Sequence, residues 1–206
     1  MSALQGSGAP RSHVNGERER TIYAGVLGLV REVGFEALTM DLVSARLRMS
    51  KATLYRRWAN KAELVAAALS HAQPVSADTI DSGTLSRDLD ELAVRAGGSA
   101  AEACSLFSAM MHAMRTRPDL EQSMRRHFID VQLESLRALV ARAVRRGEVG
   151  QDCPAVPYFA ELVVGALVSR HLLTGRDPDA AYLREYFRSV VPPSLGCPQP
   201  VSDGTH

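Results

Sequence analysis

The chain is poor in the residues that build metal centres and disulfides. Its 206 residues include three cysteines, one tryptophan and only 5% aromatic residues. Cys104, Cys153 and Cys197 are widely spaced and contain no C-x-x-C pair, so we expect free thiols in a reducing cytoplasm. None of the six histidines lies four residues from another or at metal-ligand spacing from a cysteine. We therefore predict neither a metal nor a cofactor.

Patterns typical of catalytic centres and membrane segments are also missing. The sequence has no glycine-rich phosphate loop, no nucleophilic serine turn and no carboxylate pair set apart from solvated surface. No apolar stretch approaches the ~20 residues of a membrane span, and the N-terminus lacks the apolar core of a signal peptide. We expect a cytoplasmic protein with no membrane partner that is not an enzyme.

Lysine is nearly absent, and both lysines, Lys51 and Lys61, lie in one segment. Residues 1–62 hold ten Lys/Arg and five Asp/Glu, a net +5, whereas the other 144 hold fourteen and eighteen, a net −4. The total charge of +1 therefore conceals a basic head on an acidic body. Such asymmetry indicates that a polyanion contacts the head only. The alternative for the charge cluster by itself is a solvated helix face.

Residues 39–61 (TMDLVSARLRMSKATLYRRWANK) predict two short helices joined by a tight turn and followed by the start of a third. Thr39 and Ser50 precede the two short helices as N-caps, and Asn60 caps the third, over residues 61–72. The second short helix combines a narrow apolar side with a polar, cationic, hydroxyl-bearing face. A recognition helix in a DNA major groove needs such a face.

Leu54 and Trp58, four residues apart, form the apolar side of this helix. Trp58 is either a DNA contact or a core aromatic, and its register with Leu54 favours the core. Upstream, apolar residues at spacings of three and four predict a first helix over residues 17–33, which Gly34 ends.

Together these features resemble the N-terminal domain of the TetR family of transcriptional regulators. The resemblance covers residues 17–69 and rests on a long first helix, a Gly-aromatic turn, a threonine opening the second helix, and Thr-Leu-Tyr before an aromatic residue and a lysine. Here these features are Glu17–Val33, Gly34-Phe35, Thr39, Thr53-Leu54-Tyr55, Trp58 and Lys61.

One residue departs from the family pattern. Arg48 lies in the turn between the two short helices, where the family usually has a small residue, often glycine. If the turn is kept, Arg48 has to adopt a positive φ, which costs roughly 1 kcal/mol. Arg48 also lies where it can reach a phosphate.

The resemblance and the cationic face together predict which residues contact double-stranded DNA. We expect phosphate contacts from Thr53, Tyr55, Arg57 and Lys61, and contacts near bases or backbone from Thr39 and Lys51. The complete predicted DNA-binding set is Thr39, Arg48, Ser50, Lys51, Thr53, Tyr55, Arg56, Arg57 and Lys61.

The whole chain predicts an all-α fold. An N-terminal three-helix helix-turn-helix DNA-binding domain (17–72) follows a disordered arm (1–16), and a C-terminal helical ligand-binding and dimerisation domain (84–191) precedes a tail (192–206). Pro74, Gly83 and several small polar residues predict a loop or broken helix between the two domains. The helices expected in the second domain are Thr84–Ala96, Ser99–Thr116, Pro118–Arg146, Pro157–Thr174 and Asp179–Val191.

The helix expected at Pro157–Thr174 is apolar nearly all round, which predicts burial on more than one side. In a body of this size one side faces the core, and a second copy covers the other, with Tyr182, Tyr186 and Phe187 beside it. A homodimer with a four-helix interface across a two-fold axis follows, and it suits a palindromic operator. The alternative is a monomer that encloses this helix.

A methionine-rich stripe suggests where a small-molecule effector binds, because methionine lines adaptable pockets. The predicted effector-binding residues are Cys104, Phe107, Met110, Met111, His112, Met114, Phe128 and Gln132. By itself such a stripe also fits plain core. The resemblance implies that a ligand in the C-terminal body alters the separation of the two heads. We therefore expect a TetR-like repressor released by an effector; the alternative is a constitutive DNA-binding regulator without a pocket.

Overall fold

The computed structural model describes residues 11–72, 77–98, 106 and 110–196. Every regular element among the described residues is helical, so the predicted all-α class is confirmed. The chain divides into two compact units. The first, which we call the head, consists of Met1–Gln73 and Ala109–Phe128; the second, the body, consists of Pro74–Ser108 and Ile129–His206.

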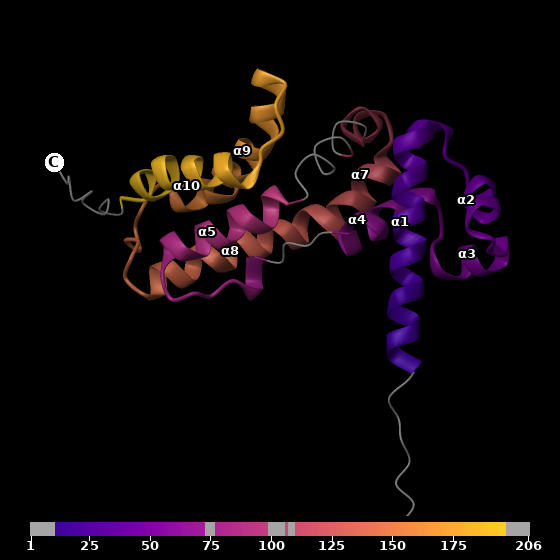
Figure 1. Ribbon diagram of the computed structural model, residues 1–206, viewed down its shortest axis with the longest axis horizontal. Helices are drawn as coiled ribbons and strands as arrows, with labels where there is room; N and C mark the ends of the chain where they lie inside the picture. Colours follow the sequence, from indigo (N-terminus) through magenta and orange to yellow (C-terminus); the bar gives the residue numbers. More distant parts are fainter. Residues whose placement is uncertain (1–10, 73–76, 99–105, 107–109, 197–206) are drawn as a thin grey trace, which may run out of the picture. The chain divides into compact units, whose positions relative to one another are not determined.

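The head is built around α4, which packs against both α1 and α7 (Figure 1). The helix α2 packs against α1 and against α3, which completes the helix-turn-helix. A π-helix, η2, continues directly from α7 and ends at the border between the two units. The bounds are α1 (Arg11–Ala37), α2 (Met40–Leu47), α3 (Lys51–Arg57), α4 (Lys61–Ala72), α7 (Pro118–Met124) and η2 (Arg125–Ile129).

The head differs from the predicted 17–72 domain because it also contains residues 109–128. We expected these residues in the C-terminal body, but Met110, Leu120 and Met124 are at most 2% exposed and α7 lies against α4. Helical periodicity identifies a buried side but not the helix that covers it. The sequence therefore predicted the helix and not its partner.

The first helix begins earlier than expected. Residues 11–16 are helical, so the expectation of a disordered arm up to residue 16 is wrong for these six positions. Adding turns to an existing helix costs much less than nucleating one, so an apolar stripe is not required there. Gly34 interrupts the helix at φ 76°, ψ 164°, as predicted, and the chain turns back so that Phe35 and Leu38 enter the core.

The body is a second helical bundle with its own apolar core. Thr84 and Asp179 cap α5 and α10 by accepting hydrogen bonds from the N–H groups of Arg87 and Tyr182. The predicted helix over 118–146 is present as a continuous helical run that contains η2. Most of the helix predicted over 99–116 lies outside the described residues. The elements of the body are η1 (Ala77–Thr79), α5 (Leu85–Gly97), α8 (Asp130–Arg145), η3 (Val156–Tyr158), α9 (Phe159–Thr174) and α10 (Ala180–Ser194).

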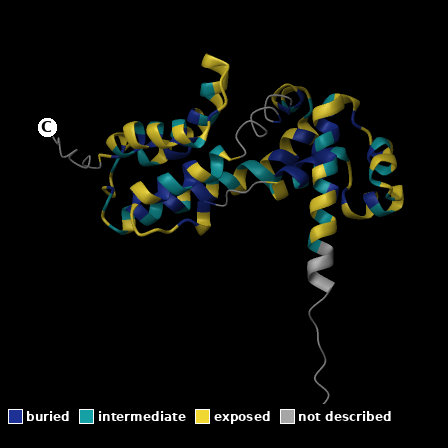
Figure 2. Ribbon diagram, viewed as in Figure 1, coloured by how far each residue is buried: buried dark blue, intermediate teal, exposed yellow. Residues whose placement is uncertain are grey.

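The helices α5 and α10 form the most extensive contact in the body, and a glycine permits it. A Cβ atom added at Gly97 would lie 2.3 Å from the backbone nitrogen of Ala180, closer than atoms can approach. The α5 side chains Leu85, Leu89 and Leu92 share one core with side chains of α8, α9 and α10. Figure 2 shows the buried residues of the chain in dark blue.

A buried carboxylate fixes the start of α5 to the end of α8. Asp88 is fully buried and accepts hydrogen bonds from the backbone N–H and the hydroxyl of Ser82, both at 2.7 Å, and from Arg146 at 2.9 Å. Arg146 also pairs with Asp81 and Glu148. Burial by itself raises the pKa of Asp88, but these hydrogen bonds and the Arg146 charge outweigh it and hold the pKa below its ordinary value.

We expect Asp88→Asn to lower the free energy of unfolding at neutral pH by about 1–3 kcal/mol, because Arg146 loses a buried charged partner. A carboxyl whose pKa is depressed by folding stabilises the protein above its unfolded pKa and loses this contribution as the pH falls through its folded pKa. The difference between wild type and variant should therefore shrink below about pH 4. Thermal unfolding of wild type and variant, at neutral pH and below about pH 4, measures this difference. Asp81→Asn, at an exposed carboxylate of the same cluster, is the control and should cost much less.

Candidate nucleic-acid interface

The turn between α2 and α3 has the geometry that the sequence predicted. Arg48 adopts φ 50° and ψ 43°, and it is the only non-glycine residue with positive φ in the described part of the chain. The Met49 N–H donates to the Ser44 carbonyl at 3.1 Å, and the Ser44 hydroxyl donates to the Met49 carbonyl at 2.6 Å. These two bonds close the turn and fix where α3 begins.

The two predicted N-caps of this motif are confirmed. The Thr39 hydroxyl accepts the N–H of Leu42 at 3.1 Å, and the Ser50 hydroxyl accepts the N–H of Thr53 at 3.1 Å. The Ser50 and Thr53 hydroxyls also lie 2.8 Å apart. Three of the residues predicted to contact DNA therefore stabilise the N-terminal ends of α2 and α3.

The recognition helix has one buried side and one open side. Leu54 and Trp58 are buried, so the core interpretation of Trp58 is confirmed. The rest of its surface carries Lys51, Tyr55, Arg56 and Arg57, all exposed.

Two of these cations have partners within the head. Lys51 Nζ lies 2.7 Å from an Asp41 oxygen, and Arg57 pairs with Glu19 while its guanidinium lies 4.9 Å from the centroid of the Trp58 ring. Both ion pairs are solvent-accessible, and exposed pairs contribute only about 0–1 kcal/mol. A phosphate can therefore replace either carboxylate at little cost.

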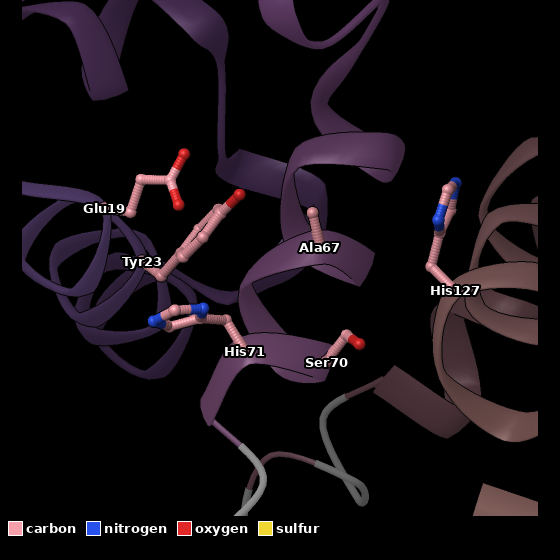
Figure 3. A pocket seen from close by; sticks show the side chains of 6 residues that line it. All are labelled: Glu19, Tyr23, Ala67, Ser70, His71 and His127. Carbon is pink, nitrogen blue, oxygen red and sulfur yellow. The ribbon is translucent and has the colours of Figure 1, made fainter. Parts of the chain in front are cut away.

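Residues of α1, α4 and η2 line a polar hollow of about 320 Å³ in the head (Figure 3). Within it the Tyr23 ring lies 4.9 Å from that of His71 and 5.8 Å from that of Trp58. Burial raises the pKa of Tyr23, and the negative charge of Glu19 raises it further. Sequence reasoning did not find this hollow, because its residues come from α1, α4 and η2 without a shared pattern. It is lined by Glu19, Tyr23, Ala67, Ser70, His71 and His127.

The Lys61 ammonium, in contrast, is directed into the head. Its Nζ donates to the backbone carbonyls of Phe35, Glu36 and Leu38 at 2.9, 3.0 and 2.9 Å. Burial lowers the pKa of Lys61, and the nearby Glu36 charge opposes this effect. The sequence placed Lys61 in the DNA-binding set but gave no sign of these contacts.

Two stretches of the chain match models of one protein family. Residues 22–68 match the model described as bacterial regulatory proteins of the tetR family, and residues 79–190 match the model of the tetracyclin repressor-like C-terminal domain. The chain belongs to the TetR family. It is accordingly a transcriptional regulator with a helix-turn-helix DNA-binding domain and not an enzyme, and regulators of this family bind DNA operators and act as dimers.

Individual TetR-family proteins are similar over most of their length. An uncharacterised HTH-type transcriptional regulator of Mycobacterium tuberculosis is 31% identical over 178 residues, which cover 86% of this chain and 88% of the relative. A DNA-binding transcriptional repressor TetR of Mycobacteroides abscessus is 32% identical over 176 residues, covering 84% and 92%. The crystal structure of a TetR family transcription regulator superposes with a TM-score of 0.68 at 20% identity, covering 88% of this chain and all of the other, which supports the fold.

The predicted effector residues are not brought together in the body. Cys104 and Phe107 lie outside the residues whose side chains are described. Met110, Met111, His112, Met114 and Phe128 belong to the head, and Gln132 belongs to the body. Met110 is 1% exposed whereas Met111 is 44% exposed, so at least part of the stripe is head core.

We expect Arg48→Gly to raise the free energy of unfolding by up to about 1 kcal/mol. The left-handed conformation costs a non-glycine residue about 1–2 kcal/mol, and the extra freedom of glycine in the unfolded chain offsets roughly 0.4–1 kcal/mol of the gain. Urea unfolding measures the difference. Arg48→Ala removes the same charge but keeps the Cβ, so equal stabilities of the two variants would contradict this account.

Proposed function

We propose that this TetR-family chain is a cytoplasmic repressor that binds a palindromic operator as a homodimer and is released by a small-molecule effector. The observation that carries the DNA-binding part is the exposed cationic face of α3 on a helix-turn-helix, within residues 1–62, which carry a net charge of +5. The repressor role is supported by the 32% identical relative that is named a DNA-binding transcriptional repressor.

The proposed contacts follow from exposure along α2 and α3. Arg56 and Tyr55 project from the recognition helix, and Arg48 projects from the turn before it. No ion pair is recorded among the described residues for Arg48 or Arg56. Arg57 and Lys51 reach phosphates by exchanging their carboxylate partners. The hydroxyls of Thr39, Ser50 and Thr53 lie at the helix starts, where caps and backbone N–H groups commonly meet phosphates.

The salt dependence of binding tests this assignment. Each phosphate contact contributes about 0.9 to the slope of log K against log salt, so Arg56→Ala should reduce the slope by about 1.8 for a dimer that loses one contact per subunit. Fluorescence anisotropy with a duplex that the wild-type protein selects from a random-sequence pool measures it.

Arg87→Ala is the matched control, because Arg87 is exposed on α5 of the body and its loss changes net charge equally. We expect its slope to equal that of wild type. An Arg56→Ala slope equal to wild type would remove Arg56 from the contact set, and a wild-type protein that selects no duplex would overturn the function.

The proposed homodimer is supported by an apolar stripe on α9. Val164, Val168 and Leu172 recur every four residues on one side of the helix and are 38%, 36% and 79% exposed. The opposite side, with Val163 and Ala166, is buried in the body core. By length and composition alone the helical run Val156–Thr174, which joins η3 to α9, could also cross a membrane, but a helix with one side in a protein core needs only its other side covered. We propose a second copy as the cover.

One residue expected beside the interface is buried within the body instead. Phe187 is fully buried in the body core with Leu183 and Val191, so its predicted place beside the interface is wrong. Tyr182 and Tyr186 are partly buried and keep their proposed place. An aromatic on the inward side of an amphipathic helix is indistinguishable from an interface aromatic in sequence alone.

We expect Leu172→Arg to yield a folded monomer. Leu172 is 79% exposed in the single chain, so an arginine there leaves the body core intact but places an unpaired charge in the interface. Static light scattering at low micromolar concentration measures the mass. Val94→Arg, at an exposed apolar position of α5, is the control and should remain dimeric. A dimeric Leu172→Arg protein would count against this interface.

The effector is proposed to be a mostly apolar small molecule. It releases the operator only if it binds the DNA-free arrangement of the heads more tightly than the DNA-bound one. A coupling of about 1–3 kcal/mol weakens operator binding by roughly 5- to 150-fold. Release of the selected duplex with the dimer intact distinguishes this regulator from a constitutive DNA-binding protein.

A further inference from the structure

The Lys61 side chain satisfies all its hydrogen-bonding capacity within the head. An ammonium group has three N–H donors and no acceptor. Lys61 Nζ lies within 3.0 Å of three backbone carbonyl oxygens, those of Phe35, Glu36 and Leu38. To bind a phosphate, the ammonium would have to give up contacts that already use its donors.

The three carbonyls belong to the segment Phe35–Leu38, which we call the α1–α2 junction. Gly34 breaks the helical conformation just before it, and carbonyls at the end of a helix lack partners within that helix. The Phe35 ring, 2% exposed, lies 4.6 Å from Lys61 Nζ, so the cation also contacts an aromatic face. The junction and the lysine therefore form one compact polar contact at the edge of an apolar core.

This contact connects both ends of the helix-turn-helix. Lys61 is the first residue of α4, and only residues 58–60 separate it from the end of α3. Leu38, whose carbonyl Lys61 binds, directly precedes Thr39, the N-cap of α2. A single side chain thus fixes the exit of the recognition helix against the entrance of the helix before it.

A second cation, at the N-cap of α7, supports the same junction. Arg117 pairs with Glu36 at 3.5 Å, and its guanidinium lies 6.0 Å from the Phe35 ring centroid. Arg117 also pairs with Asp119. The junction is therefore held from two helices, and only Lys61 adjoins the recognition helix in sequence.

We infer that Lys61 is a positioning residue for DNA binding, which sets the placement of α3 by tying its exit to the α1–α2 junction and does not itself contact phosphate. This inference rests on the proposed function and replaces the direct contact that the sequence suggested. The two roles differ measurably, because a lost phosphate contact weakens binding to all sequences equally and lowers the salt slope. A misplaced recognition helix weakens binding to the selected sequence and leaves the slope of non-specific binding unchanged.

The test compares Lys61→Met and Lys61→Arg with wild type on two probes, the selected duplex and a random duplex of equal length. Methionine keeps most of the stem over Phe35 and loses all three donors. We expect it to weaken binding of the selected duplex by about tenfold or more, to bind the random duplex nearly as wild type does, and to leave the salt slope on that duplex unchanged.

Lys61→Arg keeps the positive charge, which a phosphate contact needs, but a planar guanidinium cannot converge three N–H groups from one atom on three carbonyls. We expect it to lose affinity for the selected duplex as well. Circular dichroism and light scattering verify that the variants are folded dimers, and the arginine variant carries the test if the methionine variant is unfolded.

Three results would overturn the inference: a random-duplex slope lower by about 1.8 in Lys61→Met, full affinity and specificity in folded Lys61→Arg, or wild-type affinity in both variants. The Arg56→Ala protein calibrates the slope expected for a true phosphate contact. Failure of the wild-type protein to bind any duplex would instead reject the proposed function, so the two failures are distinguishable.

Discussion

The head depends on the burial of α4 between two other helices. Six of its seven apolar residues from Ala62 to Leu69 are at most 8% exposed, and three of these six are alanines, which let neighbouring backbones approach closely. The recognition helix is too short to fold alone, since it has seven residues and buries only Leu54. Its position is therefore set by α4, by the capped turn before it and by the contact of Lys61 with the α1–α2 junction.

Features with local causes were predictable from the sequence. Thr39 and Ser50 cap helices because a short hydroxyl side chain reaches an N–H three residues on, and Arg48 adopts positive φ because the turn demands it. Trp58 was assigned to the core from its register with Leu54 alone. In each case the determining atoms lie within a few residues of one another.

Features with distant causes were not predictable. The Lys61 contact joins residues 23 to 26 positions apart in the sequence. The membership of residues 109–128 in the head depends on which helix covers an apolar side, and the sequence encodes only that a side is apolar. The π-helix η2 leaves no mark of its own in the hydrophobic pattern. The effector site was least predictable, because a methionine stripe has the same composition in a core as in a pocket.

Carboxylates already occupy part of the surface proposed for DNA. Asp41 pairs with Lys51, and Glu19 pairs with Arg57. A polyanion that binds here has to displace these intramolecular partners. Because each exposed pair contributes only about 0–1 kcal/mol, a row of phosphates that meets several cations at once exchanges them at little cost.

The head is assembled from two stretches of chain, and the helical run from α7 through η2 to α8 leaves it without a break. A fragment ending at residue 73 would lack Leu120 and Met124, which are buried in the complete unit. A first third of the chain exchanged with a relative would therefore have to pack against an α7 that comes from the original chain. The side chains that the incoming α4 presents to Leu120 and Met124 thus restrict which DNA-binding segments this chain can accept.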